Sequence, residues 1–217
     1  MGRNITRISA YGKARRRGVI SMGIAASILV VLLAMFVFGS SPIIDLILKK
    51  RRDKKGDDII REPWQEIHDI PGYHDARNIA AFYPLKGEPN IMPIIEELAL
   101  EGRLLLPRCE GDGIMNFYKV GSLRKDLVKG HFGIKEPKEG LPKFEGEIPI
   151  FLVPGTKFNW DGKRVGHGKG YYDRFLAKYP NAFKAGIATP KQIYNEPLEQ
   201  KETDVKMHVV IACREKY

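Results

Sequence analysis

An apolar segment followed by a loop with three alternate glycines constrains this chain more than any other feature. Residues 148–153 read I-P-I-F-L-V, and the loop reads R-V-G-H-G-K-G-Y-Y-D-R from Arg164 to Arg174. Glycines at this density let the backbone approach a ligand closely and expose its N–H groups. Arg164 and Lys169 supply charge for phosphate, and the helix-forming run 171–178 follows at once. We interpret the segment as an anion-binding loop that leads into a helix.

The common nucleotide-binding motifs do not fit this loop. The dinucleotide fingerprint G-x-G-x-x-G requires glycine where Tyr171 stands, and the P-loop requires G-x-x-x-x-G-K-[ST]. The alternative interpretation is a glycine-rich connection with incidental charges. Residue types alone leave both interpretations open.

The net charge of +10 at first suggests a nucleic-acid-binding protein, but its distribution argues against one. Residues 1–55 contain twelve Lys and Arg and two acidic residues, which accounts for the whole excess. The other 162 residues contain 24 basic and 24 acidic side chains. A globular part without net charge lacks the basic surface that nucleic acids require, so we expect no nucleic-acid partner.

The N-terminal region is predicted to carry a membrane anchor. Residues 19–38 contain no charged side chain, and twenty helical residues span about 30 Å, the thickness of the hydrocarbon core. We therefore divide the chain into a basic tail (1–18), an anchor helix (19–38), a basic linker (39–62) and an α/β domain (63–217). The alternative is that 19–38 forms a buried helix of the domain.

Beyond the linker, short apolar runs alternate with a helical period. Strands are predicted at 78–83, 103–107, 116–120, 148–153, 185–188 and 209–212, and helices at 91–100 and 171–178. This alternation predicts an α/β fold with a mostly parallel sheet flanked by helices in three layers. Ligands of such sheets bind beyond the carboxyl ends of the strands, where the segment 153–170 is expected.

Several blocks of this domain resemble one family in order and spacing. V-P-G-T-K-F-N-W-D-G-K-R-V-G-H-G-K-G-Y-Y-D-R-F-L (Val153 to Leu176) resembles the signature of the 5-formyltetrahydrofolate cyclo-ligase family. Further agreement lies at 76–84, at Glu88 with 93–95, and at 102–107, 132–137 and 197–205. The resemblance covers about residues 64–217.

The resemblance implies an ATP- and Mg²⁺-dependent ligase of one-carbon metabolism. Its members close 5-formyltetrahydrofolate to 5,10-methenyltetrahydrofolate, with release of ADP and phosphate. The formyl oxygen attacks the γ-phosphate, and the neighbouring folate nitrogen then attacks the activated carbon. Because no enzyme nucleophile is required, catalysis consists of positioning and charge stabilisation. The catalytic domain would then lie in the cytoplasm, anchored to the inner face of a membrane through residues 19–38.

The resemblance also implies roles for single residues. Catalytic roles fall on Arg164, Lys169 and Tyr171. ATP would be bound by Arg164, Val165, Gly166, His167, Gly168, Lys169, Gly170, Tyr171 and Tyr172, with Lys13 and Arg17 from the N-terminal tail. Reduced folate would contact Leu85, Glu88, His167, Gly168, Lys169, Gly170 and Tyr171. Mg²⁺ would be held by Asp173 and Asp204, because carboxylate oxygens are its preferred protein ligands.

Each of these roles has a plain structural alternative. Asp173 could favour the first turn of its helix, Asp204 could be a turn residue, and Glu88 could be an ordinary surface acid. The two tyrosines after the loop could belong to the core. The chain also departs from the family pattern at Asn90, and the K-x-x-x-R motif formed by Lys13 and Arg17 lies upstream of its usual place.

Two other functions stay open at this point. The displaced K-x-x-x-R motif is compatible with a non-catalytic, membrane-anchored relative that binds folate or nucleotide. A membrane scaffold is the third hypothesis, and it would use only the basic flanks of residues 1–55. The intact set Arg164, Lys169, Asp173 and Asp204 favours the enzyme.

Overall fold

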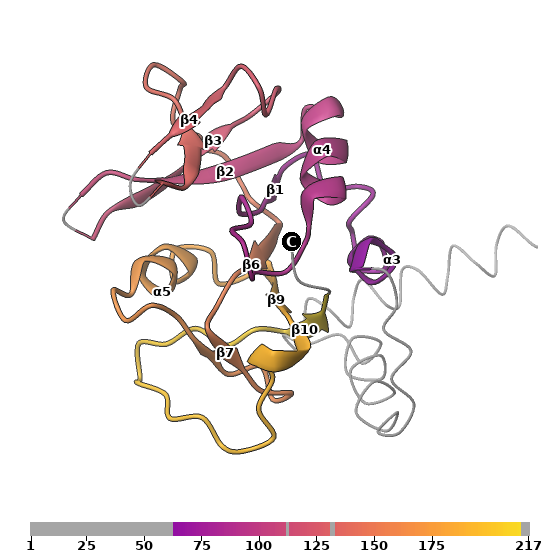
Figure 1. The fold of residues 1–217 in the computed structure, drawn as a ribbon, viewed down its shortest axis with the longest axis vertical. Helices are drawn as coiled ribbons and strands as arrows, with labels where there is room; N and C mark the ends of the chain where they lie inside the picture. Colours follow the sequence, from indigo (N-terminus) through magenta and orange to yellow (C-terminus); the bar gives the residue numbers. More distant parts are fainter. Residues whose placement is uncertain (1–62, 112, 131–132, 214–217) are drawn as a thin grey trace, which may run out of the picture. The chain divides into compact units, whose positions relative to one another are not determined.

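The computed structural model describes residues 63–111, 113–130 and 133–213, and these form a mixed α/β domain around one main sheet (Figure 1). The sheet order is β10-β9-β6-β1-β2-β3. Neighbouring strands pair in parallel except for β3, which runs antiparallel to β2. This confirms the predicted mostly parallel sheet. The strands are β1 (Ile79–Ala80), β2 (Leu104–Cys109), β3 (Met115–Lys119), β6 (Ile150–Val153), β9 (Phe183–Ala188) and β10 (Val209–Ala212).

Helices cover the sheet as their apolar periods predict. Helix α4 (Met92–Leu100) buries Ile94, Ile95 and Leu98, and α5 (Tyr171–Leu176) buries Phe175 and Leu176. Figure 1 shows α4 and α5 on opposite sides of the sheet. The remaining helical elements are short, namely α3 (Pro63–His68) and the 3₁₀ turn η2 (Pro190–Gln192).

Two small antiparallel hairpins lie outside the main sheet, and the sequence analysis did not predict them. One pairs β4 (Leu127–Lys129) with β5 (Lys135–Pro137), and the other pairs β7 (Lys157–Phe158) with β8 (Arg164–Val165). Strands of two or three residues are too short for a period of two to stand out. Asp161 and Gly162 close the β7–β8 hairpin, where Gly162 has φ +83°.

The strand order creates a switch point at β1. From β1 the chain proceeds to β2 on one side, whereas β6, β9 and β10 extend the sheet on the other side. The loops that follow β1 and β6 therefore leave the same edge of the sheet in opposite directions. Ligands of open α/β sheets bind in the crevice that such loops create. The turn at 85–88, which contains the predicted folate residues Leu85 and Glu88, lies in the connection after β1. The glycine loop (166–170) lies in the connection after β6.

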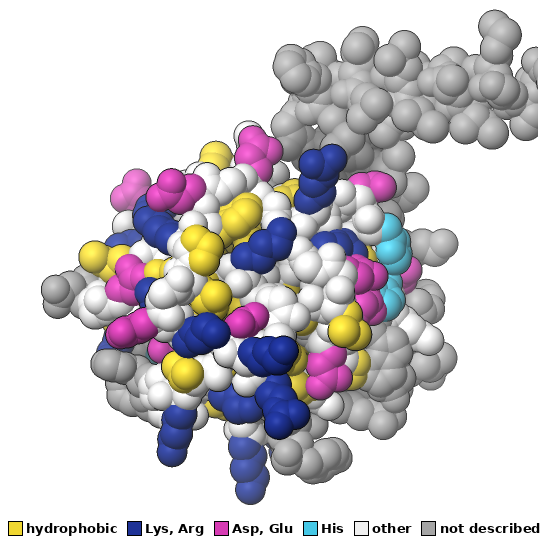
Figure 2. Space-filling view, turned by 90° about the horizontal axis from the view of Figure 1, so that it is seen from above, with side chains coloured by type: hydrophobic (Ala, Val, Ile, Leu, Met, Phe, Trp, Pro, Cys, Tyr) yellow, Lys and Arg dark blue, Asp and Glu magenta, His cyan; other side chains and the backbone are white. Residues whose placement is uncertain are grey.

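The predicted basic tail (1–18), anchor helix (19–38) and basic linker (39–62) lie outside the described residues. Among the helices that the structure does describe, none is both long and apolar enough to cross a membrane. On the face shown in Figure 2, Lys and Arg side chains are interspersed with Asp and Glu over the upper part, and several Lys and Arg side chains gather over the lower part.

A buried lysine fixes the end of α5 to the sheet. Lys184 on β9 is 2% exposed, and burial lowers the pKa of its ammonium group. Its Nζ donates hydrogen bonds to the carbonyl oxygens of Tyr179 (2.7 Å), Ala182 (2.9 Å) and Pro180 (3.3 Å). These carbonyls lie in the connection between α5 and β9, so Lys184 holds the helix that follows the glycine loop.

We predict that Lys184→Met lowers the free energy of unfolding by about 3 kcal/mol, because buried carbonyl oxygens lose their donor. Urea denaturation measures the change. The control is Lys178→Met, in which an exposed lysine near the end of α5 receives the same substitution; it should change stability by less than about 0.5 kcal/mol. Equal effects of the two substitutions would contradict the anchoring role.

Candidate active site

The glycine loop begins at the end of the β7–β8 hairpin and is fixed there by Thr156. The Thr156 N–H and hydroxyl donate to the carbonyl oxygen of Val165 at 2.7 and 3.0 Å. The hydroxyl also lies 3.3 Å from the carbonyl oxygen of Gly166. These contacts hold the start of the loop beside the end of β6, at the switch point.

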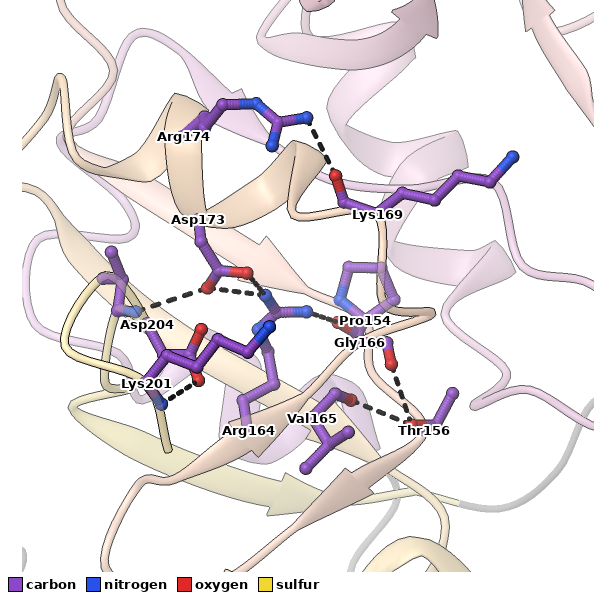
Figure 3. Close-up of polar contacts among 11 residues, drawn as sticks. Pro154, Thr156, Arg164, Val165, Gly166, Lys169, Asp173, Arg174, Lys201 and Asp204 are labelled. Atoms are coloured by element: carbon purple, nitrogen blue, oxygen red, sulfur yellow. Dashed lines mark hydrogen bonds and ion pairs between the residues drawn. The ribbon is translucent and has the colours of Figure 1, made fainter. Parts of the chain in front are cut away.

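The other end of the loop is held by Arg174 on α5 (Figure 3). Its Nη2 donates to the carbonyl oxygens of Lys169 (2.8 Å) and Gly113 (2.9 Å), the latter in the turn between β2 and β3. Gly168 and Gly170 have φ values of +82° and +64°, which L-residues adopt only with strain. The loop is thus fastened at both ends, and glycine supplies the conformation between them.

Arg164 and Asp173 form a buried ion pair beside the loop. The Arg164 Nη2 lies 2.8 Å from both carboxylate oxygens of Asp173, and the two side chains are 3% and 15% exposed. Nη1 donates to the carbonyl oxygen of Pro154 at 3.3 Å. The sequence analysis predicts that Arg164 binds phosphate and that Asp173 binds metal. The structure instead brings the two side chains onto each other.

Asp204 lies beside this pair. It belongs to the chain segment that precedes β10. Its Oδ2 accepts the Lys201 N–H at 2.8 Å, which closes a turn, and the following residue, Val205, donates its N–H to Asp173 Oδ1 at 3.3 Å. The described residues contain no group of three or more His, Cys, Asp or Glu side chains suited to a metal. Two neighbouring carboxylates fit a Mg²⁺ ion held largely by phosphate and water, but Asp173 would have to share its oxygens with Arg164.

The predicted folate residues Leu85 and Glu88 share a tight turn after β1. Glu88 Oε2 accepts the Leu85 N–H at 2.8 Å, and the Glu88 N–H donates to the Leu85 carbonyl oxygen at 3.1 Å. Leu85 is 36% exposed. The carboxylate is therefore held in place by its own turn, and its other oxygen, Oε1, takes no part in this contact.

Electrostatic interactions link this turn to the glycine loop. Burial is the main cause that raises the pKa of the Tyr172 phenol; Arg164 opposes the rise, and Glu88 and Cys109 add to it. Burial likewise raises the pKa of the Cys109 thiol, which Glu136 raises further and Lys169 lowers. The turn after β1, the strands β2, β5 and β8, the glycine loop and the start of α5 therefore contribute to these two electrostatic environments.

The sequence analysis gave no site role to Cys109 or Glu136. Glu136 is 8% exposed on β5, and a Cβ atom added to Gly130 would lie 2.4 Å from its Oε2. Its position in the block 132–137, which carries part of the family resemblance, was the available signal. Cys109, at the end of β2, is half-buried and gave no signal of its own.

The other residues with a predicted site role are exposed, pack against the core or lie outside the described residues. His167 and Lys169 are exposed, and Figure 3 shows the Lys169 side chain extending away from the Arg164–Asp173 pair. Tyr171 and Tyr172 are half-buried and pack against the core. Lys13 and Arg17 lie outside the described residues.

We predict that Gly155→Ala destabilises the protein more than Gly168→Ala. An added Cβ at Gly155 would lie 2.7 Å from Cζ of the fully buried Phe158, so the core must shift, at a cost of about 1–3 kcal/mol. At Gly168 the space is open, and only the positive φ is strained, at about 1 kcal/mol. Urea denaturation compares the two, and a smaller loss at Gly155 would contradict the packing described here.

Comparison with known proteins identifies the family that this chain resembles. The 5-formyltetrahydrofolate cyclo-ligase family matches residues 48–213. A Schizosaccharomyces pombe protein named probable 5-formyltetrahydrofolate cyclo-ligase is 28% identical over 163 residues, which cover 68% of this chain and 80% of the relative. The Escherichia coli 5-formyltetrahydrofolate cyclo-ligase is 28% identical over 150 residues, which cover 63% of this chain and 78% of that protein.

Solved structures agree. The NMR structure of Aquifex aeolicus 5,10-methenyltetrahydrofolate synthetase superposes with a TM-score of 0.59 at 31% identity, covering 79% of this chain and 90% of that one. A Mycoplasma pneumoniae 5,10-methenyltetrahydrofolate synthetase, at 24% identity and a TM-score of 0.52, shares the fold over 77% of this chain and 94% of its own. The family match covers most of the chain, so this protein belongs to the 5-formyltetrahydrofolate cyclo-ligase family.

Proposed function

We propose that this protein catalyses the ATP-dependent closure of 5-formyltetrahydrofolate to 5,10-methenyltetrahydrofolate, with release of ADP and phosphate. The observation that carries the proposal is the position of the family's signature segment. Residues 153–176 connect β6 to α5 and place the glycine loop in a connection that leaves the same edge of the sheet as the turn that contains Glu88. A phosphate-binding loop opposite a fixed carboxylate suits a reaction that joins a nucleotide and a folate.

The reaction requires two bond exchanges and no enzyme nucleophile. The formyl oxygen attacks the γ-phosphorus of ATP, the bond to ADP breaks, and the formyl carbon becomes an activated phosphate ester. The neighbouring folate nitrogen then attacks that carbon, and phosphate leaves with the formyl oxygen. Such chemistry depends on alignment of the two substrates and on stabilisation of charge on the transferred group.

The glycine loop is the proposed phosphate site. Its backbone N–H groups and the exposed Lys169 would contact the ATP phosphates, together with the neighbouring residues Val165, Tyr171 and Tyr172. Lys169 and Tyr171 would also face the reacting edge of the folate. Lys13 and Arg17 have the spacing of the family's K-x-x-x-R motif, and they can complete the nucleotide site only if residues 19–38 do not span a membrane, because a span would put them and the catalytic domain on opposite faces.

The folate would lie against the turn after β1. Glu88 accepts hydrogen bonds as a carboxylate and would take N–H donors of the pterin ring, with Leu85 on the pocket wall. His167, Gly168 and Gly170 would line the opposite side. The proposal is supported by the parallel pairing of β1 with β6, because the chain then leaves both strands at the same edge of the sheet.

Asp173 and Asp204 are the proposed Mg²⁺ ligands. The ion would neutralise charge on the ATP phosphates when it is bound. Asp173 offers oxygens that Arg164 already orients, and Asp204 offers the one oxygen that its turn does not use.

We propose the finer organisation of the whole chain on sequence grounds alone. It comprises a three-layer arrangement, an N-terminal hydrophobic helix at 19–38 as a membrane anchor, and a catalytic domain in the cytoplasm. The second candidate is a non-catalytic, membrane-anchored relative that binds folate or nucleotide. The displaced K-x-x-x-R favours it, whereas the retained Lys169, Asp173 and Asp204 favour the enzyme.

Turnover by the full-length chain in detergent tests the proposed function. The protein is mixed with 5-formyltetrahydrofolate, ATP and Mg²⁺, and the methenyl product is followed by its near-ultraviolet absorbance. We expect product formation that requires ATP and yields one ADP per product. Binding of the folate without turnover would instead support the non-catalytic relative.

We predict that Lys169→Ala lowers kcat by about 10²- to 10³-fold, because a cation that faces the transferred phosphoryl group is lost. The fold should be retained, as circular dichroism and urea denaturation can verify. Lys178→Ala, at another exposed lysine, serves as the matched control and should leave kcat unchanged. Unchanged turnover of Lys169→Ala would remove this residue from the phosphate site.

We predict that Glu88→Gln raises KM for 5-formyltetrahydrofolate by about tenfold and leaves KM for ATP within about twofold, because hydrogen bonds to a charged acceptor are the stronger ones. The amide oxygen can still accept the Leu85 N–H, so the turn is kept. Glu96→Gln, at an exposed position of α4, is the control. A change in KM for ATP alone would contradict the assignment of Glu88 to the folate side.

A further inference from the structure

We propose that Arg164 acts on the reaction through Asp173, as a positioning residue, and does not itself contact a phosphate group. This inference rests on the proposed cyclo-ligase function and gives one residue of its site a different role. Three observations carry it. They are the hydrogen-bond partners of the Arg164 guanidinium, the close packing around it, and the chain segments that its ion pair joins.

The hydrogen-bonding capacity of the guanidinium is directed inward. Nη2 binds both Asp173 oxygens at 2.8 Å, and Nη1 binds the carbonyl oxygen of Pro154 at 3.3 Å. Nε is buried and has no hydrogen-bond partner in the described part of the chain. With 3% of the side chain exposed, no face of the group is presented to a ligand outside the loop.

The side chain is enclosed by backbone that approaches it closely. A Cβ atom added to Gly166 would lie 2.8 Å from Arg164 Nη1, and one added to Gly155 would lie 3.0 Å from its Cγ. The ring of Tyr172 lies 5.6 Å from the guanidinium carbon. To reach a phosphate, Arg164 would have to leave this enclosure and abandon the Asp173 carboxylate, at the cost of an unpaired buried charge.

Asp173 transmits the contact to the rest of the site. It belongs to the first turn of α5, directly after the glycine loop, and it accepts the Val205 N–H at 3.3 Å. The ion pair therefore joins β8, α5 and the segment that contains Asp204. Figure 3 shows the pair beside the loop, with Lys169 extending away from it. Arg164 sets the position of the loop, and Lys169 carries the exposed positive charge.

A double-mutant cycle separates this role from direct phosphate binding. ADP is used as the probe and EDTA is present, so that binding requires neither turnover nor a metal. Arg164→Met is measured in the unsubstituted chain and in the Asp173→Asn background, by isothermal titration calorimetry with the full-length chain in detergent. Asparagine keeps an acceptor for the Val205 N–H but removes the charge that Arg164 orients.

We expect Arg164→Met to weaken ADP binding by about tenfold or more in the unsubstituted chain, and by less than about twofold in the Asp173→Asn background. An arginine that binds phosphate directly would lose the same factor, or a larger one, in both backgrounds. That result would overturn the proposal, as would an unchanged affinity of Arg164→Met in the unsubstituted chain.

Arg164→Lys keeps the test decisive if Arg164→Met does not fold. Lysine retains the charge but not the planar guanidinium. It is measured in both backgrounds, and we expect it to weaken ADP binding by about tenfold or more in the unsubstituted chain and by less than about twofold in the Asp173→Asn background, whereas an equal loss in both would overturn the proposal. Turnover of the unsubstituted chain is measured alongside. Its absence would contradict the proposed function, whereas ADP binding alone decides the role of Arg164.

Discussion

The buried ion pair between Arg164 and Asp173 is the interaction on which the candidate site depends. Removal of two charges from water costs several kcal/mol per ion, and the short contacts of the pair, with one further hydrogen bond to each partner, offset that cost, although Arg164 Nε has no hydrogen-bond partner among the residues that the structure describes. Pro154 and Val205 supply those bonds. Loss of one partner would leave an unpaired charge, at about 3–5 kcal/mol. The pair thus fixes three segments that are distant in sequence.

The site follows from this pair and from the topology of the sheet. The switch at β1 sends two loops from one edge, and the ion pair, Thr156 and Arg174 fasten the glycine loop there. Lys184 secures the far end of α5. A reaction without an enzyme nucleophile needs this kind of support, because its rate depends on the alignment of two substrates.

The sequence predicts the core elements better than the contacts between them. Strand β10 has the predicted bounds, 209–212, and α4, whose apolar residues recur with a helical period, differs from its predicted range by one residue. Strand β1 covers only Ile79–Ala80 of the predicted range 78–83. Pro84, directly after that range, has no N–H to donate to a neighbouring strand. The glycine loop and its helix could be predicted from residue types. The pairing of Arg164 with Asp173 could not, since a hairpin and a loop bring these residues together and spacing alone does not reveal it.

The most direct test of the central claim follows the formyl oxygen. If this site transfers a phosphoryl group to the substrate, the oxygen of the formyl group leaves with phosphate. 5-Formyltetrahydrofolate labelled with ¹⁸O in the formyl group is converted by the full-length chain with ATP and Mg²⁺, and the inorganic phosphate is analysed by mass spectrometry. The account predicts one ¹⁸O atom in each phosphate released. Unlabelled phosphate, with the label in water, would contradict it.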